Sequence, residues 1–104
     1  MRIILFLIIA CCHGLGNAKT PWPENLKTKN IAQCTERMTV KGLSKETAPG
    51  YCSCLANAME KAFGVEEYTA MTQAQPNPKG SENDRKLASI VSECVARTRP
   101  RLAQ

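Results

Sequence analysis

Cysteine is the residue type with the most evident chemistry in this chain. Cys52 and Cys54 are separated by a single serine, and a CxC pair of this kind can exchange disulfides with another thiol. The other cysteines are Cys11, Cys12, Cys34 and Cys94. The first question is therefore which of these thiols react, which bind a metal and which form structural disulfides.

Residues 1–18 have the composition of a secretory signal peptide. Arg2 supplies a positive charge, an apolar run follows, and Gly16-Asn17-Ala18 is a small-residue cleavage site. The apolar run is too short for a transmembrane helix, which needs about 20 residues. Cleavage after Ala18 would leave 86 residues of the 104, from Lys19 to Gln104. We therefore expect a periplasmic or secreted chain with no transmembrane segment.

The same stretch allows a second interpretation, in which the protein carries a lipid anchor. Ile8-Ile9-Ala10-Cys11 is similar to a bacterial lipobox, and Cys11 would then become the lipidated first residue. Such a signal would hold only ten residues, fewer than the usual number of about 15–30. Cleavage after Ala18 is favoured, and an outer-membrane lipoprotein is the alternative.

Cleavage after Ala18 leaves Cys34, Cys52, Cys54 and Cys94. An even number of cysteines in a short exported chain favours two disulfides over free thiols. Two residues that are two positions apart on a helix point about 200° apart, so Cys52 and Cys54 are not expected to bond to each other. Cys34 and Cys94 then each pair with one of them. The spacing leaves open both Cys34–Cys52 with Cys54–Cys94 and Cys34–Cys54 with Cys52–Cys94.

Other chemistry finds little support. The only histidine, His13, is removed with the signal peptide, and with it the usual catalytic base. A four-cysteine zinc site usually has paired CxxC motifs, which this chain lacks. Glu66 and Glu67 are neighbours on a predicted helix and diverge, so they do not form a catalytic pair. We expect no catalytic residue, cofactor or metal ligand, with a thiol–disulfide oxidoreductase using the CxC pair as the alternative.

The charge of the chain is mildly basic. Without residues 1–18 it holds 13 basic and 9 acidic side chains, a net charge of +4. Basic residues concentrate only in Arg97-Thr98-Arg99-Pro100-Arg101, and no basic and aromatic residues alternate as in nucleic-acid-binding surfaces. We expect no nucleic acid as partner. Another exported or envelope protein is the expected partner.

The elements that must position the cysteines are helical. Residues 19–30 contain Pro21 and Pro23 and are expected to be extended, with Trp22 as a lid over the helices. Asn25 or Thr28 is the expected cap of a first helix that ends near Val40. A domain of four cysteines then spans residues 31–99, and residues 100–104 form a tail.

Three further helices are predicted in this domain. One starts near Thr47, with Pro49 in its first turn, and stops at Gly64. A short one covers 65–71, and residues 73–80 form a loop. The last starts at the capping-box-like Ser81-Glu82-Asn83-Asp84 and ends at Pro100. Its expected apolar face consists of Leu87, Ile90, Val91 and Cys94. The predicted fold is all-α, a small disulfide-stapled bundle of three main helices and one short helix.

Four features in order carry a resemblance: Cys34, Gly42-Leu43-Ser44, Tyr51-Cys52-Ser53-Cys54 and a distant Cys94. The chain resembles a loose group of small exported helical proteins of Gram-negative bacteria that share a YCxC motif. The resemblance implies the same fold and is nearly silent about function. We therefore expect a non-enzymatic protein that binds another protein, and on analogy alone an immunity-type inhibitor of a toxin.

Overall fold

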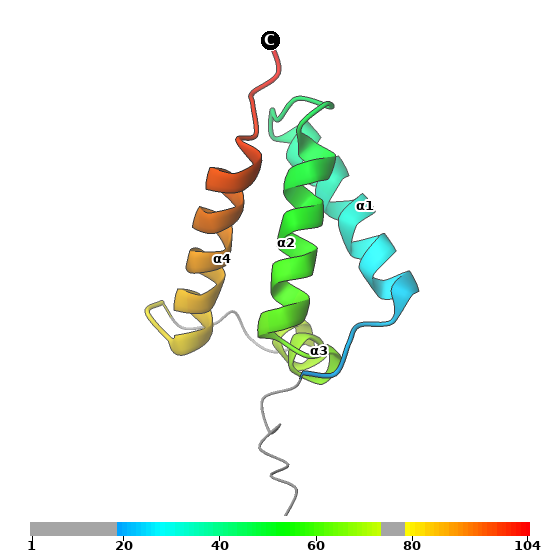
Figure 1. Ribbon diagram of the computed structural model, residues 1–104, viewed down its shortest axis with the longest axis vertical. Coiled ribbons are helices and arrows are strands. Elements are labelled where there is room, and N and C mark those ends of the chain that lie inside the picture. Colours follow the sequence, from blue (N-terminus) through cyan, green and yellow to red (C-terminus); the bar gives the residue numbers. More distant parts are fainter. Residues whose placement is uncertain (1–18, 74–78) are drawn as a thin grey trace, which may run out of the picture.

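The computed structural model describes residues 19–73 and 79–104, which form four helices (Figure 1). They are α1 (Glu24–Val40), α2 (Ala48–Ala62), α3 (Val65–Gln73) and α4 (Glu82–Thr98). The described residues contain no strand, only an isolated antiparallel bridge between Leu43 and Leu102. The prediction of a small, disulfide-stapled all-α fold with three main helices and one short helix is confirmed.

Helix α2 is the central element of the bundle. It packs against α1 on one side and α4 on the other, whereas α1 and α4 contact each other little. The short α3 lies at the end of α2, where the chain turns back towards α4. The buried cluster lies along α2 and its neighbours and consists of Cys34, Tyr51, Cys52, Phe63, Ile90 and Cys94. The core is thus built around the cysteines.

The first helix begins earlier than predicted. It starts at Glu24, so the expectation of an extended segment over 19–30 is wrong from that residue onward. Pro23 is the N-cap, with backbone angles outside the helical region (φ −54°, ψ 141°), and its carbonyl accepts from the Lys27 N–H at 3.1 Å. No side-chain cap is formed, so neither Asn25 nor Thr28 has the expected role. The proline pair therefore keeps only residues 19–23 extended.

Helices α2 and α4 begin where the sequence predicts. Thr47 is the N-cap of α2 and Pro49 lies in its first turn. Ser81 is the N-cap of α4, and its Oγ accepts from the Asp84 N–H at 3.2 Å. The Asp84 carboxylate accepts in return from the Gly80 N–H at 2.7 Å, one residue before the cap. Ser81 and Asp84 therefore form a variant of the capping box, in which the second hydrogen bond goes to the residue before the N-cap.

Candidate functional site

Two disulfides join α2 to its neighbours. Cys34–Cys52 connects α1 with α2, and Cys54–Cys94 connects α2 with α4; the Cα–Cα distance is 5.7 Å in both. This is one of the two combinations that the spacing left open. The bonded residues are 18 and 40 positions apart, which corresponds to about 3 and about 4 kcal/mol in the chain-entropy model. All four candidate cysteines are therefore used, as two clasps on one helix.

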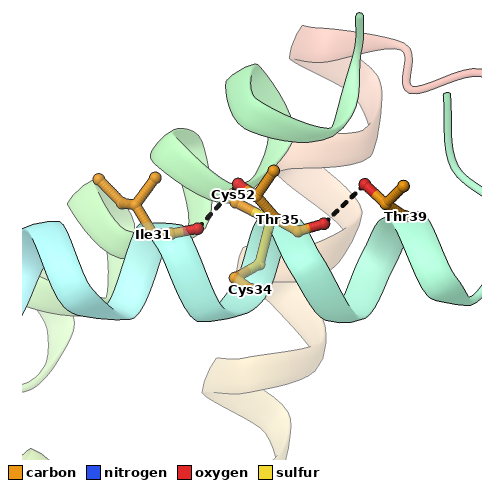
Figure 2. The surroundings of a disulfide bond; sticks show 5 residues. All are labelled: Ile31, Cys34, Thr35, Thr39 and Cys52. Atoms are coloured by element: carbon orange, nitrogen blue, oxygen red, sulfur yellow. Dashed lines mark hydrogen bonds between the residues drawn. A yellow bond between two sulfur atoms is a disulfide. The ribbon is translucent and has the colours of Figure 1, made fainter. Parts of the chain in front are cut away.

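The Cys34–Cys52 bond is drawn in Figure 2 with Ile31, Thr35 and Thr39 of α1. The Thr35 hydroxyl donates to the Ile31 carbonyl and the Thr39 hydroxyl to the Thr35 carbonyl, each at 2.8 Å. Cys52 is fully buried and Cys34 is 6% exposed. A thiolate can attack a disulfide only if it reaches one of the two sulfurs. The surroundings of this bond are those of a structural disulfide.

The Cys54–Cys94 bond has different surroundings. Cys94 is 1% exposed, but Cys54 is partly exposed, and both cysteines line an open groove along α2 and α4. The charged residues of this groove are Lys27, Glu60, Lys61, Glu93 and Arg97. Arg97 pairs with Glu93 at 3.2 Å and Lys27 with Glu60 at 3.1 Å. Of the two disulfides, this one is the more accessible to a reductant.

Trp22 is buried at the end of the bundle that lies opposite the α1–α2 connection. It is 4% exposed, its Nε1–H donates to the Phe63 carbonyl at 2.9 Å, and its ring lies 4.2 Å from that of Tyr68. The segment before it runs close to Gly64, where a Cβ would lie 3.0 Å from the Thr20 backbone nitrogen. The buried position of Trp22 agrees with the predicted lid over the helices.

Glu60 ties the extended segment to α2. Its carboxylate accepts from the Trp22 backbone N–H at 2.9 Å and from the Lys27 ammonium at 3.1 Å. The hydrogen bond from the Trp22 backbone, followed by that from Lys27, holds the pKa of Glu60 below its ordinary value of 4.5. Sequence inspection missed this residue, because its partners lie more than 30 positions away.

The adjacent glutamates Glu66 and Glu67 lie at the start of α3. The Glu67 carboxylate accepts from the Lys19 ammonium at 2.6 Å, and this hydrogen bond lowers the pKa of Glu67. Glu66 is exposed. Both carboxylates lie in the first turn of α3, where they complement the helix dipole.

The outer side of α4 holds two valines that the core does not use. Val91 is 43% exposed and Val95 is 44% exposed. The expected apolar face of this helix is therefore wrong at Val91, while Ile90 and Cys94 are buried as predicted. A spacing of four residues places Val91 and Val95 on one flank, about 160–200° from Glu93. The exposure of Val91 and Val95 had one sign in the sequence: the apolar residues of this helix cover a wider stripe than contact with one neighbouring helix requires.

Within residues 19–73 and 79–104, no group of three or more histidine, cysteine, aspartate or glutamate side chains is placed to hold a metal ion. None of the helices in these two ranges is long and apolar enough to cross a membrane. Cys11, the candidate lipidation site, lies outside the described residues.

Comparison with known proteins adds no relative: no family model matches the chain, and neither a curated protein nor a solved structure is significantly similar to it.

Proposed function

We propose that this chain is a small exported protein that acts by binding another exported or envelope protein, and that it has no catalytic activity. Two disulfides in a short helical chain support export, because such bonds persist in oxidising compartments. Residues 1–18, with the composition of a signal peptide, support it independently. The similarity to small exported YCxC proteins is part of the same proposal.

The observation that carries the binding proposal is the exposed pair Val91 and Val95 on α4. About two fifths of each side chain is open to solvent, and they share one flank of the helix. The small, exposed residues Ala88, Ser92 and Ala96 extend this flank. We call these five residues the α4 face; none of them is charged. Protein interfaces are likewise depleted in charge at their centre.

Rigidity supports the same proposal. Helix α4 is bonded to α2 through Cys94, which lies within the stretch 88–96 that carries the α4 face. A surface that is already ordered loses little conformational entropy when a partner binds. An immunity-type inhibitor of a toxin belongs to this proposal on analogy alone.

Affinity capture from an envelope extract tests the proposal. The tagged protein is compared with the double variant V91S/V95S, and A32S/A70S serves as the control, since Ala32 and Ala70 are exposed helical residues elsewhere. We expect a stoichiometric partner that the control retains and V91S/V95S loses. Repeated recovery of no stoichiometric partner would contradict the binding function. Equal recovery by V91S/V95S would contradict the α4 face as its site.

The intact mass of the purified protein tests export and the state of the cysteines. A chain that begins at Lys19 and resists alkylation without a reductant agrees with signal cleavage and two disulfides. Acyl mass on Cys11 would instead identify the lipoprotein. Two thiols open to alkylation in the native protein would favour the thiol–disulfide exchange factor, which uses Cys52 and Cys54.

A further inference from the structure

One end of the bundle is built from two segments far apart in the sequence. Residues 40–46 comprise the last residue of α1 and most of its connection to α2, and residues 99–104 follow α4 (Figure 1, top). We call these two segments the tip. The Ser44 N–H donates to the Arg101 carbonyl at 2.7 Å, and the Ala103 N–H to the Gly42 carbonyl at 2.6 Å. The backbone of the tip is therefore held in place on both sides of Leu102.

Two large apolar side chains protrude from this ordered backbone. Val40 is 83% exposed and Leu102 is 73% exposed, more than Val91 or Val95 on the α4 face. The backbone of Leu102 forms a bridge with that of Leu43, yet the Leu102 side chain remains largely exposed to solvent. Single exposed apolar residues are common on proteins. Two at the same end, one of them on a backbone fixed by hydrogen bonds, form a feature that another surface can use.

The charges of the tip have mainly one sign. Its basic residues are Lys41, Lys45, Arg99 and Arg101, and its only acidic side chain is Glu46. Within the described residues, none of these four basic side chains lies within 4.0 Å of a carboxylate. The opposite end of the bundle holds the acidic first turns of α3 and α4, which contain Glu66, Glu67, Glu82 and Asp84. Two of these carboxylates are in ion pairs, Glu67 with Lys19 and Glu82 with Lys86, so the excess of one sign lies at the tip.

Helix dipoles account for part of this pattern. Both α1 and α4 end at the tip, and cations beside helix C-termini are favourable. The dipoles do not account for the protruding Val40 and Leu102. Lys41 and Lys45 are also unlike the centre of a protein interface, from which lysine is depleted. The same combination suits a lipid surface, with apolar groups in the interfacial region and cations opposite phosphates.

We propose that the tip docks on the surface of an anionic lipid bilayer. Leu102 and Val40 enter the boundary between head groups and acyl chains, while the four basic side chains lie opposite lipid phosphates. This inference is independent of the proposed protein binding, because the α4 face shares no residue with the tip.

Vesicle co-sedimentation of the exported protein, from Lys19 to Gln104, tests the proposal. Vesicles of phosphatidylcholine alone are compared with vesicles that contain about 30% phosphatidylglycerol, at low and high salt. We expect binding to the anionic vesicles that weakens with salt. The variant K41Q/K45Q should bind about fivefold more weakly for each basic side chain removed. The control K29Q/K61Q removes the same charge from exposed lysines outside the tip and should bind like wild type.

Two further variants complete the set. One tests the apolar contribution to vesicle binding, and the other removes a charge at a position where the fold is kept. V40S/L102S should weaken binding even at low salt, whereas V91S/V95S should not. R99G should bind about fivefold more weakly although its fold is kept, since Arg99 has a left-handed backbone (φ 47°) that glycine adopts readily.

Several outcomes would overturn the proposal. They are equal binding to neutral vesicles, absence of binding to anionic ones, and an equal loss in K29Q/K61Q and K41Q/K45Q. Sedimentation velocity and affinity capture with the tip variants complete the test. A dimer, or a captured acidic protein, that depends on the tip without vesicle binding would assign it to a second copy or to a protein. Loss of capture in V91S/V95S alone bears only on the proposed protein binding.

Discussion

Cys52 and Cys54 lie two residues apart in α2, and each is bonded to a different helix. Cys52 is bonded to Cys34 of α1 and Cys54 to Cys94 of α4. The divergence of neighbouring side chains on a helix makes this arrangement possible without distortion. In the oxidised protein the CxC pair therefore serves as a double clasp that holds three helices together.

The two disulfides are expected to differ in their resistance to reduction. Cys54 is partly exposed in the groove between α2 and α4, whereas Cys34 and Cys52 are buried, so a small thiol should reach Cys54–Cys94 first. Graded reduction of the native protein, trapping with an alkylating agent and peptide mapping measure the order. Earlier labelling of Cys34 and Cys52, or simultaneous labelling of all four, would contradict this prediction.

Two replacements of Trp22 should destabilise the bundle to different extents. Trp22→Phe keeps an aromatic ring but leaves the buried Phe63 carbonyl without its donor, which should cost about 1–3 kcal/mol. Trp22→Ala also removes the ring that packs on Tyr68 and should cost about 3–5 kcal/mol. Urea unfolding followed by circular dichroism measures both free energies. A Phe variant as stable as wild type would mean that the indole hydrogen bond contributes nothing net.

Glu60 should make stability depend on pH on the acid side. Its pKa in the folded protein lies below 4.5, so the unfolded chain takes up the proton first as the pH falls. The stability that the ionised carboxylate contributes is therefore complete above pH 4.5 and is lost as the pH falls through the lowered pKa.

In E60Q this part of the pH dependence should disappear. Urea unfolding of wild type, E60Q and E46Q between neutral and acidic pH checks the prediction, with E46Q as the control because Glu46 is exposed in the α1–α2 connection. If E60Q and wild type lose stability in parallel as the pH falls, Glu60 does not have this role.

Arg99 should be a site where glycine stabilises the protein. It is the C-cap of α4 and has a left-handed backbone, which costs a residue with a side chain about 1–2 kcal/mol. Glycine avoids this cost in the folded protein but loses more backbone freedom on folding. The free energy of unfolding of R99G should therefore exceed that of wild type by about 0.5–1 kcal/mol. Thermal unfolding at neutral pH measures the change. A lower melting temperature in R99G would indicate that the Arg99 side chain stabilises the fold by contacts of its own.

Local signals predicted most of the helices correctly. Thr47 with Pro49, Gly64, and Ser81 with Asp84 act within a few residues, so the boundaries they mark are visible in the sequence. The first helix was placed too late because Pro23 caps it through its backbone, without the side chain that a search for caps relies on. Glu60 was missed for a different reason, since its role depends on Trp22 and Lys27 from a distant segment.

The sequence by itself determined the all-α class, the helical position of the CxC pair, and the need for partners on opposite faces of that helix. These follow from helical periodicity and from local propensities. Only the tertiary structure decided that Cys52 pairs with Cys34 and Cys54 with Cys94, that Val91 lies outside the core, and that Leu102 lies beside Leu43. These relationships depend on how whole helices pack around α2, which the spacing of residues along one chain does not specify.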